Sequence, residues 1–346
     1  MAIRNGAQGL NEFAPLTTLV EREENMLERM GLFAKDFSDQ KVVEFERVYG
    51  GTDEMYSVAR GADRQYAGDD EAKTAYVEIP FFTLDKIYKA SDAQFLRKWL
   101  TETDNVTLDD KVTEIMARIQ RGHARLHKKV MYACLKGSTY AVDKAGNPRP
   151  NLTRTFQSMF DISNAEMYNS AALGAATINL ADQTKNPSDE FEKFRKHVIN
   201  SAGDQGDNYR IVALLGSEAF TLLKNHSDYV EAFANFASSE EPLRRRLGGL
   251  SNNRVLEWQG ITYIEDISGE LATDSITLFP LGFDDMFQLR YGPNDTIAAV
   301  NGDEPVAESY LFVDQDRRKA TVESSVSVVA VTSMDNLVAR YTHVVS

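Results

Sequence analysis

Residues 108–136 read LDDKVTEIMARIQRGHARLHKKVMYACLK, and they form the strongest single element in the sequence. Its apolar side chains recur at intervals of three, four and seven residues, which places them along one side of an α-helix. A helix of this length spans about 43 Å, more than twice the average helix. The apolar residues of that side are Val112, Ile115, Ile119, Leu126, Val130 and Ala133. We therefore expect one long helix that packs a single stripe against a core.

The sequence also marks the ends of this helix. Thr107 is suited to cap its N-terminus, and Gly137 is suited to end it, because glycine readily adopts the left-handed conformation that follows a last turn. Lys136 places a positive charge in the last turn, where it interacts favourably with the helix dipole. Glycine within a helix costs about 1 kcal/mol relative to alanine, so Gly122 indicates a bend or the close approach of another segment.

Two histidines four residues apart, His123 and His127, raise the question of a metal site, because they share one side of the helix. Cys134 lies about 10 Å farther along the axis, too far to complete one tetrahedral site with both rings. A zinc-protease helix would carry glutamate after the first histidine, where this chain has Ala124. We interpret the pair as half-buried packing residues and expect no metal ligand and no catalytic residue. A soluble metal-dependent enzyme centred on the pair is the alternative.

Cationic residues follow the side of the helix opposite to the apolar stripe. Arg118, Arg121 and Arg125 lie there, followed by Lys128 and Lys129. The simplest interpretation is a solvated helix surface. The alternatives are electrostatic docking against an acidic arm or loop of a neighbouring subunit, or a weak contact with a polyanion.

The sequence before the helix predicts an arm and a long two-stranded loop. Residues 1–40 carry mixed charge without a core pattern of their own. Residues 41–50 (KVVEFERVYG) alternate as a strand does, and residues 74–84 (TAYVEIPFFTL) predict a second strand, with Pro80 at a sheet edge. The tract ARGADRQYAGDDEAKT between them has almost nothing apolar to bury. We expect an extended hairpin that packs on another subunit, since so long a loop is unusual inside a compact domain.

Charged and polar residues of this loop, of the cationic helix side and of the arginine triplet in EEPLRRRLGGL are our candidates for contacts between subunits. The candidate interface residues are Arg60, Asp63, Arg64, Gln65, Asp69, Asp70, Glu71, Lys73, Arg118, Arg121, Arg125, Arg244, Arg245 and Arg246.

After the helix, the pattern changes twice. Residues 138–150 (STYAVDKAGNPRP) predict a strand and then a turn. From residue 186 to about 300, helical and strand patterns alternate, with Ser217 as a helix N-cap, and predict an α/β domain. The chain closes in valine-rich strands that we expect to join the strands following the long helix. The α/β domain would then be an insertion in a discontinuous one.

The composition excludes several classes of protein. A formal net charge of −14 over 346 residues repels DNA, which argues against a general nucleic-acid binder but not against a protein that surrounds DNA without gripping it. No apolar run is long enough to span a membrane, no secretory signal opens the chain, and a single cysteine indicates a reducing cytoplasm. Phosphate-loop, dinucleotide-turn and serine-elbow motifs are absent from the sequence, and we expect no cofactor.

The ordered set of segments resembles the major capsid proteins of tailed bacteriophages, which share the Hong Kong 97-like fold with encapsulins. The lambda major-capsid family is the most similar over nearly the whole chain. The segments that carry this resemblance are ARGADRQYAG, VMYACLKGSTYAVDKAG, VALLGSEAFTLLKNHSDYVEAF, RVLEWQGITYIED and ESSVSVVAVTSMDNLVARYTHVV.

The resemblance implies an α+β fold and a division of the chain. Residues 1–40 become an N-terminal arm and 41–92 an extended loop. Residues 93–185 and 305–346 form a peripheral β domain that includes a spine helix at 108–136. Residues 186–304 form an inserted α/β axial domain.

The resemblance also implies a function and partners. Copies would form hexamers and pentamers that close into an icosahedral head around double-stranded DNA, without sequence-specific binding and without a membrane. We expect assembly in the host cytoplasm and a separate scaffolding protein, since only about 40 residues precede the first strand. The other partners that the resemblance implies are a portal and a small decoration protein, which the lambda-like family often recruits. An encapsulin-like compartment shell is the alternative with the same fold.

Overall fold

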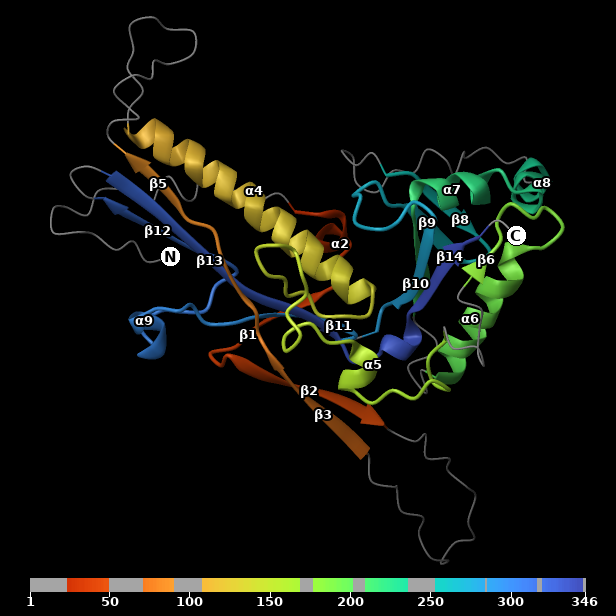
Figure 1. Cartoon of the computed structure of the whole chain (residues 1–346). Coiled ribbons are helices and arrows are strands. Elements are labelled where there is room, and N and C mark those ends of the chain that lie inside the picture. Colours follow the sequence, from red (N-terminus) through yellow and green to blue (C-terminus); the bar gives the residue numbers. More distant parts are fainter. Residues whose placement is uncertain are drawn as a thin grey trace, which may run out of the picture.

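The computed structural model describes residues 24–49, 71–89, 108–168, 177–201, 209–235, 253–283, 285–315 and 319–344. In these ranges the strands form two six-stranded sheets and one two-stranded hairpin. Figure 1 shows the first sheet lying beneath a long diagonal helix, and the second sheet beside it with shorter helices around it. The fold is a mixture of α and β elements in separate regions, as the sequence predicts.

The first sheet is built around one long strand, β13 (Lys319–Thr332). It pairs with β12 (Tyr310–Gln315) and β11 (Phe287–Tyr291), and β11 pairs in parallel with β1 (Ala34–Phe37). Short strands β4 (Phe81–Thr83) and β5 (Lys86–Lys89) pair along the other edge of β13. The first residues of β13 alternate between buried and exposed, whereas every residue from Ser324 onward is buried. The second half of this strand is therefore covered on both faces.

The long helix α4 (Leu108–Leu135) confirms the predicted helix to within one residue. Its apolar side packs on β12 and β13, where Val112, Met116 and Ile119 form a core with Leu311 and Val322. Gly137 follows the helix at a φ of 91°, a left-handed conformation that suits glycine. The predicted close approach at Gly122 is confirmed, since a Cβ there would meet Leu84 Cδ2 at 2.9 Å.

The predicted hairpin is also present. Strands β2 (Val42–Tyr49) and β3 (Glu71–Glu78) pair in antiparallel register, with Val42 opposite Glu78. Side chains of adjacent strand residues point to opposite faces of a sheet. Two adjacent residues of β11, Arg290 and Tyr291, therefore show what covers each face of the first sheet. The Tyr291 hydroxyl lies 3.3 Å from His127 Nδ1 of α4, while the Arg290 guanidinium carbon lies 5.3 Å from the ring centroid of Phe45 in β2. The helix and the hairpin therefore cover opposite faces of the first sheet.

The second sheet has the order β6-β14-β10-β7-β9-β8. Its strands are β6 (Thr177–Ile178), β7 (Arg210–Leu215), β8 (Val255–Trp258), β9 (Ile261–Glu265), β10 (Ser275–Leu281) and β14 (Ala339–His343). Three helices pack on this sheet: α6 (Pro187–Ser201), α7 (Ser217–Lys224) and α8 (Ser227–Asn235). Ile211, Ala213 and Leu215 belong to the core under these helices. Val212 and Leu214 belong instead to the core around the end of α4 and the second half of β13, which we call the main core. Strand β7 thus separates the two cores.

Short elements complete the described chain. They are α2 (Met26–Arg29), α5 (Phe156–Met159), α9 (Ile297–Val300) and a single 3-10 turn (Asp335–Leu337). Residues Met26 and Leu27 are buried in the main core, and β1 joins the first sheet, so part of the predicted arm is integral to the fold. In the ranges that the structure describes, no helix is both long and apolar enough to cross a membrane.

Strand pairing corrects one expectation. Of the closing strands, β12 and β13 lie in the first sheet, but β14 pairs with β10 in the second. Conversely, β11 comes from the predicted α/β segment and pairs with β13. Each sheet therefore contains strands from both sides of residue 304, because strand composition does not specify a distant pairing partner.

Two local expectations were also wrong. Gly216, not Ser217, is the N-cap of α7, and a Cβ at Gly216 would come within 2.2 Å of Ala272 O. Thr273 O accepts hydrogen bonds from Glu218 N and Ala219 N, so the backbone of a neighbouring loop replaces a side-chain cap. Residues 138–150 form isolated bridges rather than a strand, although Gly146 has the positive φ of the predicted turn.

Candidate functional site

The two histidines of α4 are buried by packing against the first sheet. His123 Nε2 lies 2.5 Å from Ser324 Oγ of β13, and His127 Nδ1 lies 3.3 Å from the Tyr291 hydroxyl. Both rings are fully buried rather than half-buried, because they face the sheet and not its edge. In the described ranges, no cluster of three or more histidine, cysteine, aspartate or glutamate side chains is arranged to hold a metal ion. The contacts of this pair join a helix to a sheet.

Cys134 and Tyr132, near the end of α4, are part of the same packing. Burial raises the pKa of the Cys134 thiol well above its usual range, so the reactive thiolate is disfavoured. The Tyr132 hydroxyl donates a 2.8 Å hydrogen bond to Asp266 Oδ1, and burial raises the pKa of this phenol strongly. The Tyr132 hydrogen bond joins α4 to the loop after β9, and neither group offers a nucleophile to a substrate.

A row of cations follows the solvent side of α4. Arg118, Arg121, Arg125 and Lys129 are all exposed, and we call them the cationic row. Arg121 Nε donates to its own helix at Ala117 O, and the structure gives none of the four an ion pair within the described chain. Lys128 differs, since it is partly buried and bonds to Ser268 O and Glu270. Three of the four residues, Arg118, Arg121 and Arg125, are candidates from the sequence.

The remaining sequence candidates are mostly not placed. Arg60, Asp63, Arg64, Gln65, Asp69, Asp70 and the triplet Arg244, Arg245 and Arg246 lie outside the described residues. Glu71 is the first residue of β3. The Lys73 ammonium forms an ion pair with Asp161 of its own chain, which lowers the pKa of that carboxyl. The structure thus brings Lys73 to the inner side of the hairpin rather than to its open side.

The open side of the hairpin is a surface that sequence reasoning missed. Val43, Phe45, Ala75 and Val77 are buried against the main core, so the alternate residues face outward. The carboxylates among them are Glu44, Glu46 and Glu78, which we call the acidic face. Tyr76 is 62% exposed beside them, and its hydroxyl donates to Glu44 Oε1 at 3.3 Å. The two-residue period around the predicted strands contained the signal for this surface.

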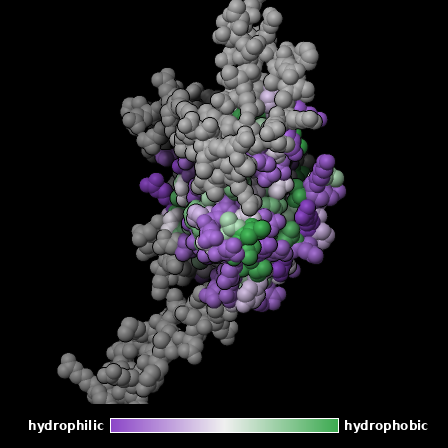
Figure 2. Space-filling view, turned by 90° about the vertical axis from the view of Figure 1, so that its left-hand side faces the viewer, coloured by the Kyte–Doolittle hydropathy of each residue, from purple (hydrophilic) through white to green (hydrophobic). Residues whose placement is uncertain are grey.

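A small apolar projection lies on another side of the molecule. Helix α9 exposes Ile297 by 72% and Val300 by 80%, the two most exposed large apolar side chains of the described residues. Thr296 Oγ1 caps this turn by accepting from Ala299 N, and Glu304 accepts from Thr296 and from Asn294. Figure 2 views the side on which α9 lies and shows a limited hydrophobic area within a largely hydrophilic surface.

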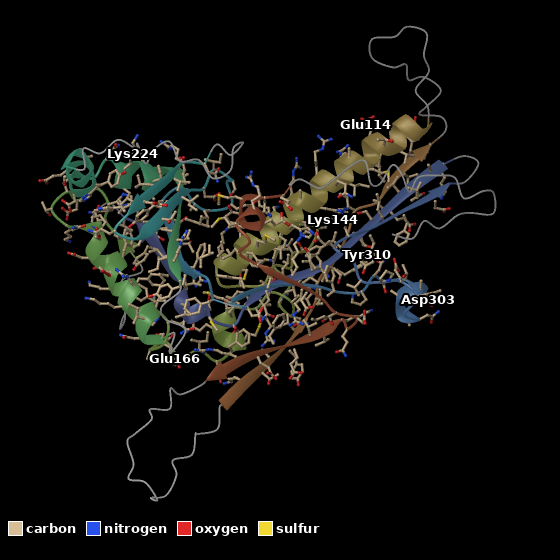
Figure 3. The ribbon with its side chains drawn as sticks, turned by 180° about the vertical axis from the view of Figure 1, so that it is seen from behind. Glu114, Lys144, Glu166, Lys224, Asp303 and Tyr310 are labelled. Carbon is tan, nitrogen blue, oxygen red and sulfur yellow. The ribbon has the colours of Figure 1, made fainter. Side chains whose placement is uncertain are left out.

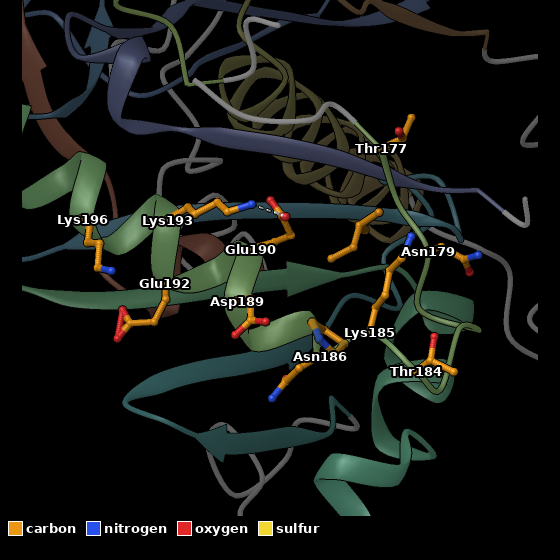
Figure 4. Close-up of a pocket in the computed structure, with 12 residues that line it drawn as sticks. Thr177, Asn179, Thr184, Lys185, Asn186, Asp189, Glu190, Glu192, Lys193 and Lys196 are labelled. Atoms are coloured by element: carbon orange, nitrogen blue, oxygen red, sulfur yellow. Dashed lines mark hydrogen bonds and ion pairs between the residues drawn. The ribbon is translucent and has the colours of Figure 1, made fainter. Parts of the chain in front are cut away.

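A polar groove runs along α6 and the segment before it, with a volume of about 860 Å³. Its charges are partly paired, since Lys193 lies 2.6 Å from Glu190, and Lys185 lies 3.8 Å from Asp182 just outside the groove. Figure 4 shows Lys193 and Glu190 pointing toward each other, with the other charged side chains spread along α6 and the segment before it. Exposed charges of both signs do not form the desolvated, convergent arrangement that catalysis requires.

The described residues therefore offer surfaces rather than a reaction centre. The comparison with protein families decides what such surfaces belong to. The family model described as "Phage major capsid protein E" matches residues 14–326.

The chain belongs to the phage major capsid protein E family.

A curated relative extends the match over nearly the full length of the chain. The major capsid protein of Pseudomonas phage KPP10 is 24% identical over 352 residues, which cover 95% of this chain and 96% of that protein. The resemblance drawn from the sequence is therefore confirmed. This chain is a phage major capsid protein, a structural protein of the virion capsid and not an enzyme.

Solved structures identify the fold. The mature capsid of bacteriophage PhiM1 matches with a TM-score of 0.52 and 11% identity, over 99% of this chain and 91% of that one. The capsid of a native GTA particle matches with a TM-score of 0.50 and 13% identity, over 97% and 99%. These similarities confirm the predicted α+β Hong Kong 97-like capsid fold. The family match favours a phage head over the encapsulin-like compartment that shares this fold.

Proposed function

We propose that copies of this chain join as hexamers and pentamers and close into an icosahedral head around double-stranded DNA. The observation that carries this proposal is the hairpin of β2 and β3. One face of the hairpin is buried in the core of its own subunit, and the other presents exposed carboxylates and an exposed tyrosine. A two-stranded sheet is marginal on its own, and a partner on its open face would add the missing layer.

The charge of the chain suits a container for DNA. A net charge of −14 opposes tight, unspecific binding of phosphate backbones, so enclosed DNA would not adhere to the wall. This supports enclosure without sequence-specific recognition. We place assembly in the host cytoplasm, with a separate scaffolding protein, a portal and a small decoration protein as partners.

The interface between subunits would include the sequence candidates that the structure does not describe. The charged tract around Arg60, Asp69 and Asp70 continues the hairpin whose base is β2 and β3. Such a tract has few apolar side chains to offset the roughly 1–2 kcal/mol that each ordered residue costs, and a neighbouring subunit would supply contacts. The arginines Arg244–Arg246 would likewise contact a neighbour. The domain division at 40, 92, 185 and 304 also belongs to this proposal.

Particle size and content test the proposal. We would express the full chain, measure its sedimentation velocity, and image the fast fraction by negative-stain electron microscopy. We expect capsomers and closed shells, and nucleic acid in shells isolated from infected cells. A protein that sediments only as a monomer at all concentrations would contradict assembly, and shells that enclose a protein cargo without DNA would instead support a compartment.

A further inference from the structure

Most of the long helix α4 carries charge of one sign only. Glu114 is its last acidic residue, and residues 115–142 contain six lysines and arginines but no aspartate or glutamate, in a chain whose formal net charge is −14. Helix α6 shows the ordinary pattern of a solvated helix, because its cations pair with carboxylates one turn earlier, as Lys193 does with Glu190 at 2.6 Å. Solvation alone therefore does not explain the charge pattern of α4.

The cationic row lies in one narrow stripe. At about 100° per residue, its four side chains project within an arc of about 80° on the solvent side of the helix. From Arg118 to Lys129 the row is about 16 Å long. None of the four has an ion pair within the described chain, whereas Lys128, at the margin of the arc, binds Ser268 O and Glu270. A straight row of positive charge is therefore open to an elongated anion.

The residue types along the row fit a phosphate backbone rather than nucleic-acid bases. Proteins that bind single strands stack the bases on aromatic side chains, and α4 has no phenylalanine, tyrosine or tryptophan before Tyr132. Double-stranded DNA carries one phosphate for about every 1.7 Å of its axis, so a row about 16 Å long passes about ten phosphates. Each cation of the row therefore finds a phosphate within reach.

The two sides of the first sheet differ in charge. The helix and the hairpin cover its opposite faces, as Arg290 and Tyr291 show. Figure 3 shows Glu114 of α4 and Glu166, the partner of Arg47 in β2, on opposite sides of the molecule. The cationic row is exposed on the helix side, and the carboxylates of the acidic face are exposed on the hairpin side. Phosphate charge therefore selects the helix side.

We propose that the cationic row binds the phosphate backbone of double-stranded DNA, so that α4 is the surface each copy turns toward the enclosed DNA. The inference rests on the proposed function, and it names the surface that touches the DNA. Binding is independent of sequence, because the contacts go to phosphates. Four contacts per copy are weak and reversible, and the net negative charge of the chain still opposes adhesion of DNA to the rest of the wall.

The salt dependence of binding counts the phosphate contacts. We would titrate unassembled, full-length chain with a fluorescent duplex of mixed sequence, about 20 base pairs long, and measure anisotropy over a range of salt concentrations. Because each contact releases counterions, log K falls against log salt with a slope of about −0.9 per contact, and four contacts predict about −3.6. Affinity should then fall about 150-fold between about 50 mM and about 200 mM salt.

Two pairs of substitutions test the row independently. Arg121→Gln with Arg125→Gln removes its middle, and Arg118→Gln with Lys129→Gln removes its ends. Each pair leaves two contacts, so the slope should weaken to about −1.8, and the affinity at about 100 mM salt should fall at least tenfold. Arg121→Lys with Arg125→Lys keeps the charge and should keep the slope of the native chain. Circular dichroism checks folding, and either neutral pair alone is a sufficient test if the other fails to fold.

Controls separate this contact from a general effect of charge. Arg195→Gln with Lys196→Gln removes the same charge from exposed positions of α6 and should leave the slope unchanged. A single strand of the same length has a lower charge density and should give a shallower slope than the duplex. All row variants should still form shells, because the proposal places DNA and not a second copy on the row. Negative-stain electron microscopy checks this.

The other outcomes overturn the inference. It is wrong if the native chain does not bind the duplex at about 50 mM salt, or if the row and α6 variants lose affinity equally. Row variants that fold but no longer assemble would assign the row to a contact with another copy instead. A native chain that forms no particles would contradict the proposed function itself, whereas native shells together with an unchanged slope in the row variants contradict the inference alone.

Discussion

Arg340 shows how single side chains join the parts of this subunit. Its Nε donates a 2.6 Å hydrogen bond to Leu135 O at the end of α4, and its Nη2 lies 2.5 Å from Asp335 Oδ1. The Asp335 side chain is only 3% exposed, so the arginine neutralises a buried carboxylate and satisfies a helix-end carbonyl together. One residue from β14 thus ties the second sheet to the long helix.

We expect Arg340→Met to lower the free energy of unfolding by about 3–5 kcal/mol, because it leaves the Asp335 charge buried without its partner. Urea unfolding of unassembled subunits, followed by circular dichroism, measures this loss. Arg195→Met is the matched control, since Arg195 pairs with Glu192 in solvent, and its effect should stay below about 1 kcal/mol. Equal losses in the two variants would contradict the role given to Arg340.

Cys134 should report unfolding. Its thiol is buried and its pKa is raised by burial, so the native protein should react with a thiol reagent only through opening of the structure. We expect iodoacetamide labelling of the native subunit to be at least 100-fold slower than labelling in urea, as followed by mass spectrometry. Because the chain has one cysteine, the labelled fraction needs no further assignment. Native labelling as fast as in urea would show that the end of α4 is not packed as described.

His197 predicts how acid affects stability. Burial lowers its pKa below the ordinary value of 6.5, and its Nε2 lies 3.0 Å from Asn336 O. Between the lowered pKa and 6.5, the unfolded chain binds more protons than the folded one, so stability falls as the pH falls through this window. His197→Gln keeps a donor but cannot titrate, and its unfolding free energy should fall less between about pH 7.5 and about pH 5 than that of the native chain. Parallel pH profiles for the two proteins would contradict this account.

At the scale of elements, the long helix depends on a contact with β4 and its loop. Gly122 leaves room for Leu84, which is half exposed and can move. Gly122→Ala should therefore be nearly neutral in the native background, because the gain in helix propensity of up to about 1 kcal/mol is offset by displacing Leu84. In a Leu84→Ala background, the same change should stabilise by up to about 1 kcal/mol.

A double-mutant cycle of urea unfolding measures this coupling. The two single variants and the double variant share the native chain as reference, so the difference isolates the contact between Gly122 and Leu84. Effects of Gly122→Ala that are the same in both backgrounds would show that the glycine has no role in this approach.

Elements with a local pattern could be predicted from the sequence. The apolar period from Val112 to Ala133 and the stop at Gly137 determine α4 to within one residue, because helix hydrogen bonds join residues four apart. The hairpin of β2 and β3 follows from alternation in the same way. Pairings between distant segments could not be predicted. Nothing in ARYTH assigns β14 to the second sheet, and nothing in AKDF pairs β1 with β11, some 250 residues away.

The same distinction between local patterns and distant pairings applies to the candidate surfaces. A helical projection is enough to find the cationic row, since Arg118, Arg121 and Arg125 lie on one side of one element. The acidic face needs two strands and their register, because Glu78 joins Glu44 and Glu46 only through antiparallel pairing. The burial of His123 and His127 likewise depends on Ser324 and Tyr291, which are far away in sequence.

At the scale of the whole molecule, the subunit is a structural unit with charged surfaces in separate directions. Its described residues bury three hydrophobic cores, and α4 and the hairpin cover the first sheet from both sides. The cationic row, the acidic face and the apolar projection of α9 all point away from these cores. Membership in a capsid family explains why a stable fold leaves such surfaces open, since a shell is held together by contacts between copies.

Electron cryomicroscopy of shells assembled from the full chain tests the central claim most directly. We expect a closed icosahedral particle in which the open side of β2 and β3 of each subunit lies against a neighbouring subunit. Figure 1 shows this hairpin at the lower side of the isolated chain. A shell in which that side faces solvent in every independent copy would contradict the account, as would a chain that stays a monomer under all assembly conditions.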